Sequence, residues 1–277
     1  MKGENKMSHL RKNTLIVLLT IFTCIGYYLL TQTKAATAPP SNVTVFVHGY
    51  KGTAVSFRSM LHRFENQHHW GKQALVCKVT KDGRVLTSKV QRYTENDRLF
   101  VQVVFENNRA SFEDTAYWLS EVMHTLKSHY GIDRVNLVGH SMGGIVSTKF
   151  LEDYRHRSKY PHVEKLVVIG SPFKGVKSED YLKANTGGAA YDLMPNSPAA
   201  QQLDDNKEAF PKHVKVLTIA GVGDQLVAVD SALAIKNIVP KENYTEAIIV
   251  DRNINHSGLH ESDEVDALIG QFLWNEK

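Results

Sequence analysis

The stretch that decides the fold is "VNLVGHSMGGIVSTKF", residues 135–150. An apolar run typical of a buried strand leads into a corner of small residues, and an apolar helix-like run follows at once. The corner, GHSMG at residues 139–143, fits the G-x-S-x-G pattern, in which a serine occupies a sharp turn between a strand and a helix. So tight a turn leaves no room for side chains two positions before and after the serine. The helix that follows directs its N-terminus at the hydroxyl and favours negative charge developing there. A plain strand–helix turn, as in nucleotide-binding folds, is the alternative reading.

On both sides of this corner, strand-like and helix-like runs alternate. The strand-like runs are "NVTVFVHGY" (42–50), "RLFVQVVF" (98–105), "RVNLVGH" (134–140), "KLVVIGSP" (165–172), "VKVLTIAG" (214–221) and "TEAIIVD" (245–251), with a hairpin pattern in "ALVCKVTKDGRVLTSKV" (74–90). Ser111 and Asp114 form a capping-box start for a helix that Gly131 ends. Strands this apolar, interleaved with helices, predict an α/β fold whose mostly parallel sheet has helices on both faces.

The chain is expected to hold one globular domain behind an N-terminal leader. We assign residues 1–38 to a signal peptide or membrane anchor with a short linker, and residues 39–277 to the domain. Residues 174–211 break the alternation of strands and helices, because glycines, prolines and polar residues accumulate there. We interpret this segment as a small lid-like insertion and not as a second domain.

The leader has the order of an export signal. Residues 1–35 carry five basic residues and one acidic residue, and the apolar run "TLIVLLTIFTCIGYYLL" (14–30) is followed by small residues. The run is long for a cleaved signal and slightly short for a spanning helix of about 20 residues. Cleavage near Ala35 or Ala36 and retention as an anchor, with membrane association through residues 14–30, therefore both stay open. Either reading places the domain outside the cell, secreted or at the cell surface.

Charge and cysteine content exclude several classes of function. Outside the leader the chain carries 28 basic and 28 acidic residues, so electrostatics gives no support for a nucleic-acid partner. Cys24 lies in the leader and Cys77 in a strand-like run, which leaves no disulfide framework and no cysteine-based metal site. The adjacent His68 and His69 have no carboxylate support in the sequence. We expect no metal site.

The motifs "VFVHGYKGTAVSFRSML" (45–61), "VNLVGHSMGG" (135–144) and "HSGLHE…FLW" (256–274) resemble those of α/β-hydrolases. More narrowly, they resemble a group of exported Gram-positive-type α/β-hydrolases classed as a domain of unknown function. The resemblance covers about residues 42–275. It implies a nucleophilic serine, an acid and a histidine in that chain order, and no cofactor.

A serine hydroxyl needs a base, and the base needs an acid that orients it. With Ser141 as the nucleophile, we predict His256 as the base, in the loop after the last strand-like run, where the family places it. His260 is its rival. We predict Asp224, directly after "VKVLTIAG", as the acid, with Asp230 as its rival.

The tetrahedral intermediate of acyl transfer needs two donors for its oxyanion. One is the backbone N–H of Met142, directly after the nucleophile. By resemblance, Tyr50 in the His48-Gly49-Tyr50 turn supplies the other, and His48 holds that loop.

These residues predict an exported serine hydrolase that cleaves small acyl esters or lipids. A thioesterase, an acyltransferase or a peptidase using the same residues stays open, as does a non-catalytic surface binder on the same fold. The sequence does not determine the oligomeric state.

Overall fold

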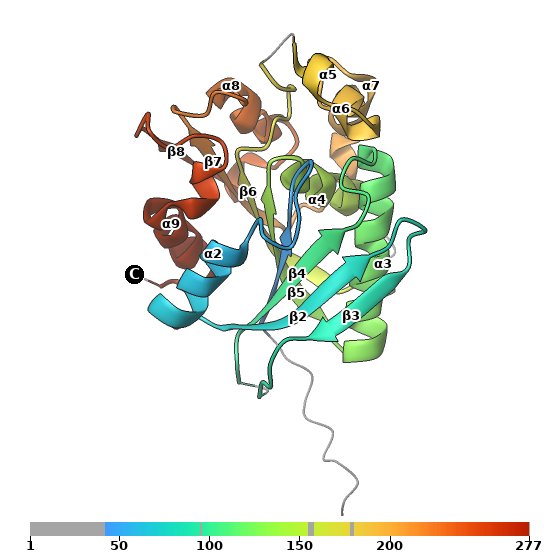
Figure 1. Ribbon diagram of the computed structural model, residues 1–277, viewed down its shortest axis with the longest axis vertical. Helices are drawn as coiled ribbons and strands as arrows, with labels where there is room; N and C mark the ends of the chain where they lie inside the picture. The colour runs from blue at the N-terminus through green and yellow to red at the C-terminus, as the bar shows by residue number, and fades with distance from the viewer. Residues whose placement is uncertain (1–41, 95, 155–157, 178–179, 277) are drawn as a thin grey trace, which may run out of the picture. The chain divides into compact units, whose positions relative to one another are not determined.

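Contacts divide the chain into two units, Met1–Ala38 and Pro39–Lys277. The computed structural model describes residues 42–94, 96–154, 158–177 and 180–276, all of which belong to the second unit (Figure 1). The leader and linker predicted at residues 1–38, with Cys24 and the apolar run 14–30, lie outside the described residues. Within the described residues, no helix combines the length and the apolar character that crossing a membrane requires.

A single eight-stranded sheet runs through the described domain. Its strands are β1 (Val43–Val47), β2 (Lys72–Val79), β3 (Val85–Lys89), β4 (Leu99–Phe105), β5 (Arg134–His140), β6 (His162–Ile169), β7 (Lys215–Gly221) and β8 (Tyr244–Ile249). They lie in the order β3-β2-β4-β1-β5-β6-β7-β8. Every neighbouring pair is parallel except β2 and β3, which form the predicted antiparallel hairpin at one edge.

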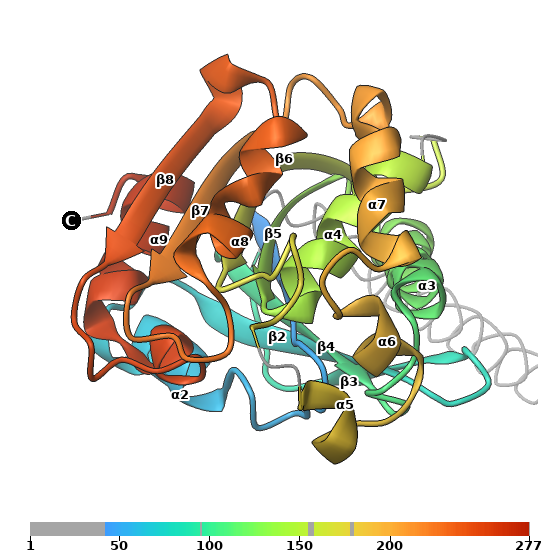
Figure 2. The same cartoon turned by 90° about the horizontal axis from the view of Figure 1, so that it is seen from above.

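Helices cover both faces of the sheet, as Figures 1 and 2 show. The longer helices are α3 (Phe112–Tyr130), α4 (Met142–Asp153), α7 (Pro198–Asp205) and α9 (Asp263–Trp274). The shorter ones are α2 (Arg58–His62), which continues as a π-helical turn η1 (Arg63–Gln67), α5 (Tyr181–Ala184), α6 (Gly188–Asp192) and α8 (Val229–Ala232). Single 3-10 turns are η2 (Lys207–Ala209), η3 (Leu233–Asn237), η4 (Lys241–Asn243) and η5 (Gly258–Glu261).

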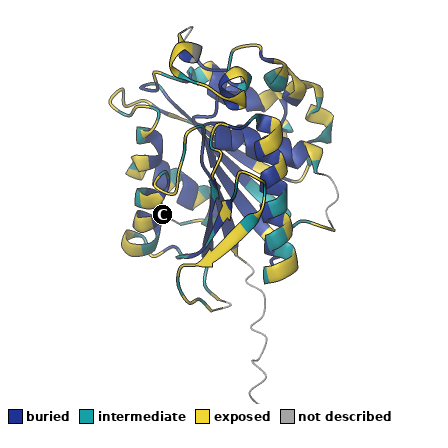
Figure 3. Cartoon of the chain, turned by 45° about the vertical axis from the view of Figure 1, so that its right-hand side comes forward, coloured by how far each residue is buried: buried dark blue, intermediate teal, exposed yellow. Residues whose placement is uncertain are grey.

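The alternation of side chains along the strands produces two apolar cores. On β1, Val45 and Val47 pack with α3 and α4, whereas Phe46 points to the opposite face and packs with α2 and α9. The central strands are buried on both faces, which explains their continuous apolar runs (Figure 3). The edge strand β3 is mostly exposed. The predicted fold, a mostly parallel sheet with helices on both faces, is confirmed.

The parallel strands bring distant loops together at one edge of the sheet. Val47 at the end of β1 pairs with Gly139 near the end of β5, so the turns after these two strands leave the sheet side by side. The loops after β6, β7 and β8 leave the same edge, because those strands continue the parallel order. Open α/β sheets bind ligands at this edge, outside the carboxyl ends of the strands.

The segment predicted as an insertion folds into short helices. It holds α5, α6, α7 and η2, and Figure 1 shows α5, α6 and α7 together at the top of the view. Helix α7 is capped by Ser197, whose hydroxyl accepts from the Ala200 N–H. Its neighbour α4 carries the buried Lys149, whose ammonium contacts Gln202 on α7 at 3.3 Å and Glu113 on α3 at 2.8 Å. The contact with Gln202 fixes one end of the insertion to the main body of the domain.

Candidate active site

Ser141 occupies a strained corner between β5 and α4. Its backbone has φ 55° and ψ −128°, in a region that residues with side chains rarely adopt. A Cβ on Gly139 would lie 2.5 Å from the Gly144 nitrogen, and a Cβ on Gly143 would lie 2.0 Å from the Val47 carbonyl oxygen. Both glycines of the G-x-S-x-G pattern are therefore required by the close approach of backbone to backbone.

Asp224 and His256 meet at the same edge of the sheet. Asp224 follows β7 and His256 lies in the loop after β8, and the Asp224 Oδ2 is 2.7 Å from His256 Nδ1. The other carboxylate oxygen accepts the N–H groups of Leu226 and Val227, at 2.9 and 2.8 Å. Asp224 is buried and the His256 side chain keeps 15% of its surface exposed. The carboxylate is thus fixed, and it orients an imidazole that still reaches solvent.

Ser141 and His256 line one cavity of about 210 Å³, together with Tyr181, Leu193 and Leu226. No hydrogen bond joins the Ser141 hydroxyl to the His256 ring within the described part of the chain. Catalytic hydrogen bonds are often long before substrate binds and tighten in the complex. A larger cavity, of about 270 Å³, opens among aromatic side chains at the far end of α4 and contains none of the predicted site residues.

The two rival residues lie in different surroundings. His260 also lines the cavity, but its Nδ1 is 3.0 Å from Glu261 Oε1, and its ring packs 5.9 Å from that of Phe57. Burial lowers the pKa of His260. Asp230 is exposed in the first turn of α8. The structure therefore brings Asp224, and not Asp230, to His256.

The two predicted oxyanion donors lie beside Ser141. Met142 begins α4, where the first N–H groups of a helix have no partner within it. The N–H groups of Met142 and Tyr50 donate no hydrogen bond to protein atoms among the described residues. A Cβ on Gly49, directly before Tyr50, would lie 2.7 Å from the Ser141 Cβ, so the loop after β1 passes against the serine.

His48 fixes the loop that carries Tyr50. The Phe105 N–H donates to His48 Nε2 at 3.1 Å, which requires Nδ1 to carry the ring proton and donate to the Gly49 carbonyl at 2.8 Å. Only the neutral ring satisfies both bonds. Burial lowers the pKa of His48 to about 4, against the hydrogen bond to Gly49, which raises it.

This histidine predicts a pH dependence of stability. Between pH 4 and 6.5 the unfolded chain protonates His48 and the folded chain does not, so the free energy of unfolding should fall as pH falls through this window. His48 alone accounts for up to about 3 kcal/mol of that loss. Buried His140 and His260 act in the same direction, because burial lowers the pKa of each. Urea unfolding from pH 7.5 to 4.5 measures the slope.

His48→Gln should lower stability at pH 7.5 and flatten that slope. The exposed His62 gives a matched control, His62→Gln, whose slope should equal that of the wild type. An unchanged slope in His48→Gln would show that the ring already titrates normally in the folded chain.

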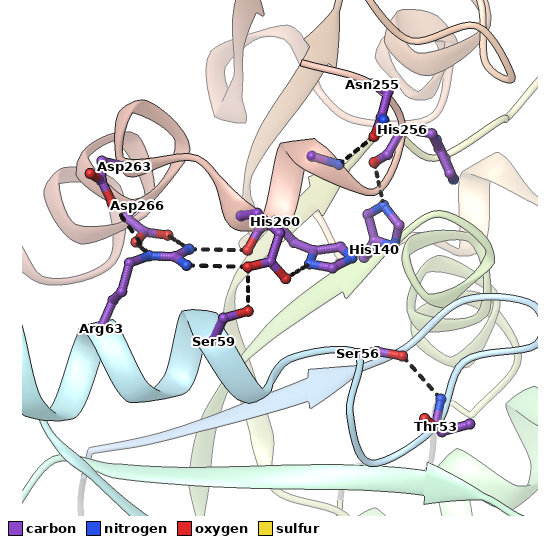
Figure 4. Close-up of polar contacts among 12 residues, drawn as sticks. Thr53, Ser56, Ser59, Arg63, His140, Asn255, His256, His260, Asp263 and Asp266 are labelled. Atoms are coloured by element: carbon purple, nitrogen blue, oxygen red, sulfur yellow. Dashed lines mark hydrogen bonds and ion pairs between the residues drawn. The ribbon is translucent and has the colours of Figure 1, made fainter. Parts of the chain in front are cut away.

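His140, the second residue of the GHSMG corner, contacts His256, and the sequence pattern did not reveal this contact. Its Nε2 donates to the His256 carbonyl oxygen at 3.0 Å, and its ring lies 4.7 Å from the His256 ring (Figure 4). On its other side the ring meets His260 edge-on at 4.5 Å. His140 thus ties the loop that carries His256 to the end of β5. The pattern leaves this position variable, so no spacing could identify it.

An ion-pair network supports the same loop from outside the cavity. Arg63 in η1 contacts Asp266 of α9 and donates to the His260 carbonyl oxygen at 3.1 Å (Figure 4). Arg63 also lies 3.4 Å from Glu261, which contacts Ser59 and the His260 ring. The loop with both histidines is therefore anchored to the helices on that face of the sheet.

Metal-ligating side chains do not gather in the described part of the chain, where no group of three or more His, Cys, Asp or Glu could hold an ion. His68 stacks on Trp70 at 4.2 Å and lies 3.9 Å from Asp266, a carboxylate neighbour that the sequence around His68 did not show. Cys77 is buried, and burial raises the pKa of its thiol to about 12.

Several solved structures share the fold of this chain. The product of the lin2722 gene of Listeria innocua is 29% identical, with a TM-score of 0.73 over 86% of this chain and 95% of that one. A candidate cell surface hydrolase of Lactobacillus plantarum WCFS1 is 24% identical, with a TM-score of 0.66 over 87% and 94%. The lipase BlEst2 of Bacillus licheniformis is 18% identical, with a TM-score of 0.53 over 86% and 92%.

No curated protein matches the chain. One family model does, over residues 31–276, and it is described as an alpha/beta hydrolase of unknown function, DUF915. The match spans the strands, the GHSMG corner and the loops that carry Asp224 and His256. The chain therefore belongs to the DUF915 family of alpha/beta hydrolases.

Proposed function

We propose that the chain is a serine hydrolase that cleaves carboxylic esters through an acyl-enzyme on Ser141. The observation that carries the proposal is the Asp224–His256 hydrogen bond of 2.7 Å at the rim of the cavity where Ser141 projects. This pair supplies an oriented base to a hydroxyl on a strained turn, which is the combination that acyl transfer needs. The lipase BlEst2, which has the same fold, agrees with this chemistry.

In the proposed reaction, His256 takes the Ser141 proton as the hydroxyl attacks the ester carbonyl. The negative charge that develops on the carbonyl oxygen is stabilised by the N–H groups of Tyr50 and Met142. His256 then returns the proton to the leaving alcohol, and a water molecule releases the acid by the same steps in reverse. Asp224 stays ionised and stabilises the imidazolium, and no step requires a metal or cofactor.

The size of the cavity favours short acyl groups. The cavity of about 210 Å³ is lined in part by Val176, Leu193 and Leu226, and it accommodates a few methylene groups. The direct test is turnover of p-nitrophenyl esters of graded length by the full chain, together with covalent labelling by a fluorophosphonate. Turnover of short esters and labelling are expected. Absence of both would favour a non-catalytic binder on the same fold.

We also propose that residues 1–38 export the domain. The support is the order of basic, apolar and small residues in the leader. Mass spectrometry of the N-terminus, after expression of the full chain in a bacterial host, should find either a start near Ala36 or an intact, membrane-bound leader. A cleaved domain should be recovered outside the cytoplasm, and an anchored domain should be reached by a protease added to cells whose cytoplasmic membrane is intact. A full-length product in the cytosolic fraction would contradict the proposal.

A further inference from the structure

The cavity at Ser141 carries a cation at its rim and no carboxylate in its lining. Lys51 is one of the lining residues, and there is no aspartate or glutamate among the described residues that line the cavity. The nearby carboxylates are already engaged: Asp224 by His256 and Glu261 by Arg63. The charge that faces a bound substrate is therefore positive.

Lys51 is held in a conformation that is unusual for its residue type. Its φ is 60°, in the left-handed region where glycine or asparagine is normally found, at a strain of about 1 kcal/mol. The backbone is fixed there, since the Lys51 N–H donates to the Asn108 carbonyl at 2.8 Å and the Asn108 amide donates to the Gly52 carbonyl at 2.9 Å. A strained residue that a rigid loop holds at the rim of a cavity points to a functional role for its side chain.

The Lys51 ammonium has no carboxylate partner among the described residues. Its contacts are a long hydrogen bond of 3.5 Å to the Ala184 carbonyl and the face of the Tyr50 ring, 5.3 Å from the centroid. Both are weak, and neither neutralises the charge. The ammonium is therefore available to an anion that enters the cavity.

A second cation, Arg109, lies near the same ring. Its guanidinium is 5.7 Å from the Tyr50 centroid and donates to the Tyr50 hydroxyl at 3.1 Å. That hydroxyl is itself fixed, because it donates to the Thr186 carbonyl at 2.7 Å and accepts the Thr186 N–H at 3.0 Å. Arg109 also lacks a carboxylate partner in the described part of the chain. Tyr50 and the insertion thus hold two cations beside the proposed oxyanion donor, and no described carboxylate pairs with either of them.

We infer that the site selects esters that bear an anionic group, a carboxylate or a phosphate, which Lys51 binds and Arg109 attracts. This inference rests on the proposed function. Lys51 directly follows Tyr50, whose N–H is proposed to bind the carbonyl oxygen, so the anion lies a few bonds from the ester group. A charge-assisted contact of this kind is worth about tenfold in kcat/KM.

The test compares esters with and without an anionic group. Monoethyl adipate and its neutral amide, ethyl adipamate, place the anion in the acyl part. Butyryl glycerol phosphate and monobutyrin place it in the alcohol part. The full chain at low salt should prefer the anionic member of one pair by about tenfold in kcat/KM, and the preferred pair identifies the side of the ester that faces Lys51. Because exposed charges are screened within a few ångströms at 0.5 M salt, the preference should shrink there.

Three variants separate the role of the charge from that of the loop. Lys51→Gln should reduce the preference to about one while keeping turnover of the neutral ester, and Lys51→Arg should restore it. Lys89→Gln, an exposed lysine on β3 that does not line the cavity, removes the same charge and should keep the preference. The esters also compete with fluorophosphonate for Ser141, so protection from labelling measures the preference in binding where turnover is slow.

Equal rates for both members of both pairs would overturn the inference, as would a preference that persists in Lys51→Gln. The proposed function would survive either result, because neutral esters would still be cleaved. If no ester is cleaved and Ser141 takes no label, the proposed function itself fails.

Discussion

Ser141→Ala should lower kcat on short p-nitrophenyl esters by about a millionfold, as removal of a nucleophilic serine does in comparable enzymes. Without the hydroxyl no acyl-enzyme forms, and His256 has no proton to take from the nucleophile. The N–H groups of Tyr50 and Met142 remain, so a small residual rate above that of water is expected. The wild-type rate is measured in a short assay, and the residual rate of Ser141→Ala is measured in a long incubation at high protein concentration.

The loss must be separated from unfolding. Alanine replaces serine at φ 55° without a change of backbone preference, and no hydrogen bond of the Ser141 hydroxyl is lost among the described residues. The urea midpoint and the circular dichroism spectrum should therefore match the wild type. Ser257→Ala, at a serine that lines the same cavity from ordinary backbone of φ −75°, should keep the fluorophosphonate label. Full activity in Ser141→Ala would exclude this serine as the nucleophile.

His256→Ala should lower kcat by at least about a thousandfold, because it removes the only imidazole that Asp224 orients in the described structure. His260→Ala should lower it much less. That ring is held by Glu261 and packs on Phe57, so its loss acts through the position of the loop. The two variants, assayed on one ester at pH 7.5, assign the base.

Asp224→Asn should fall between these two variants. The amide oxygen can still accept the N–H groups of Leu226 and Val227, but the amide nitrogen then faces His256 Nδ1 and favours the tautomer that cannot accept the serine proton. If His260→Ala were inactive and His256→Ala remained active, the base would be His260. The proposed hydrolase chemistry would be unaffected.

The sequence predicted the parts of this site that follow strands. The GHSMG corner lies between an apolar strand and an apolar helix, and Asp224 follows a strand directly. Because parallel strands end at one edge, chain order alone placed these residues near each other. The sequence also predicted the hairpin at Asp82-Gly83 and the helix between Ser111 and Gly131, because turn and cap residues mark these elements locally.

Contacts between side chains on different loops could not be read from the sequence. His140 contacts the carbonyl of His256, which lies 116 positions away in the chain. The strained backbone of Lys51 is likewise visible only in the structure. The short helices of the insertion have at most eight residues, too few for a periodic apolar pattern to emerge. The turn at Arg63–Gln67 continues α2 in π-helical form, and its Arg63 finds Asp266 through tertiary packing alone.

The central claim, that Ser141 is the nucleophile of an acyl-transfer site, is tested most directly by mapping the residue that fluorophosphonate modifies. The wild-type full chain is labelled, digested and sequenced by tandem mass spectrometry. The adduct is expected on Ser141 within the peptide that contains GHSMGG, and His256→Ala should slow its formation by about the factor by which it lowers kcat. An adduct on another residue, or an unmodified Ser141 in a chain that cleaves esters, would contradict the claim.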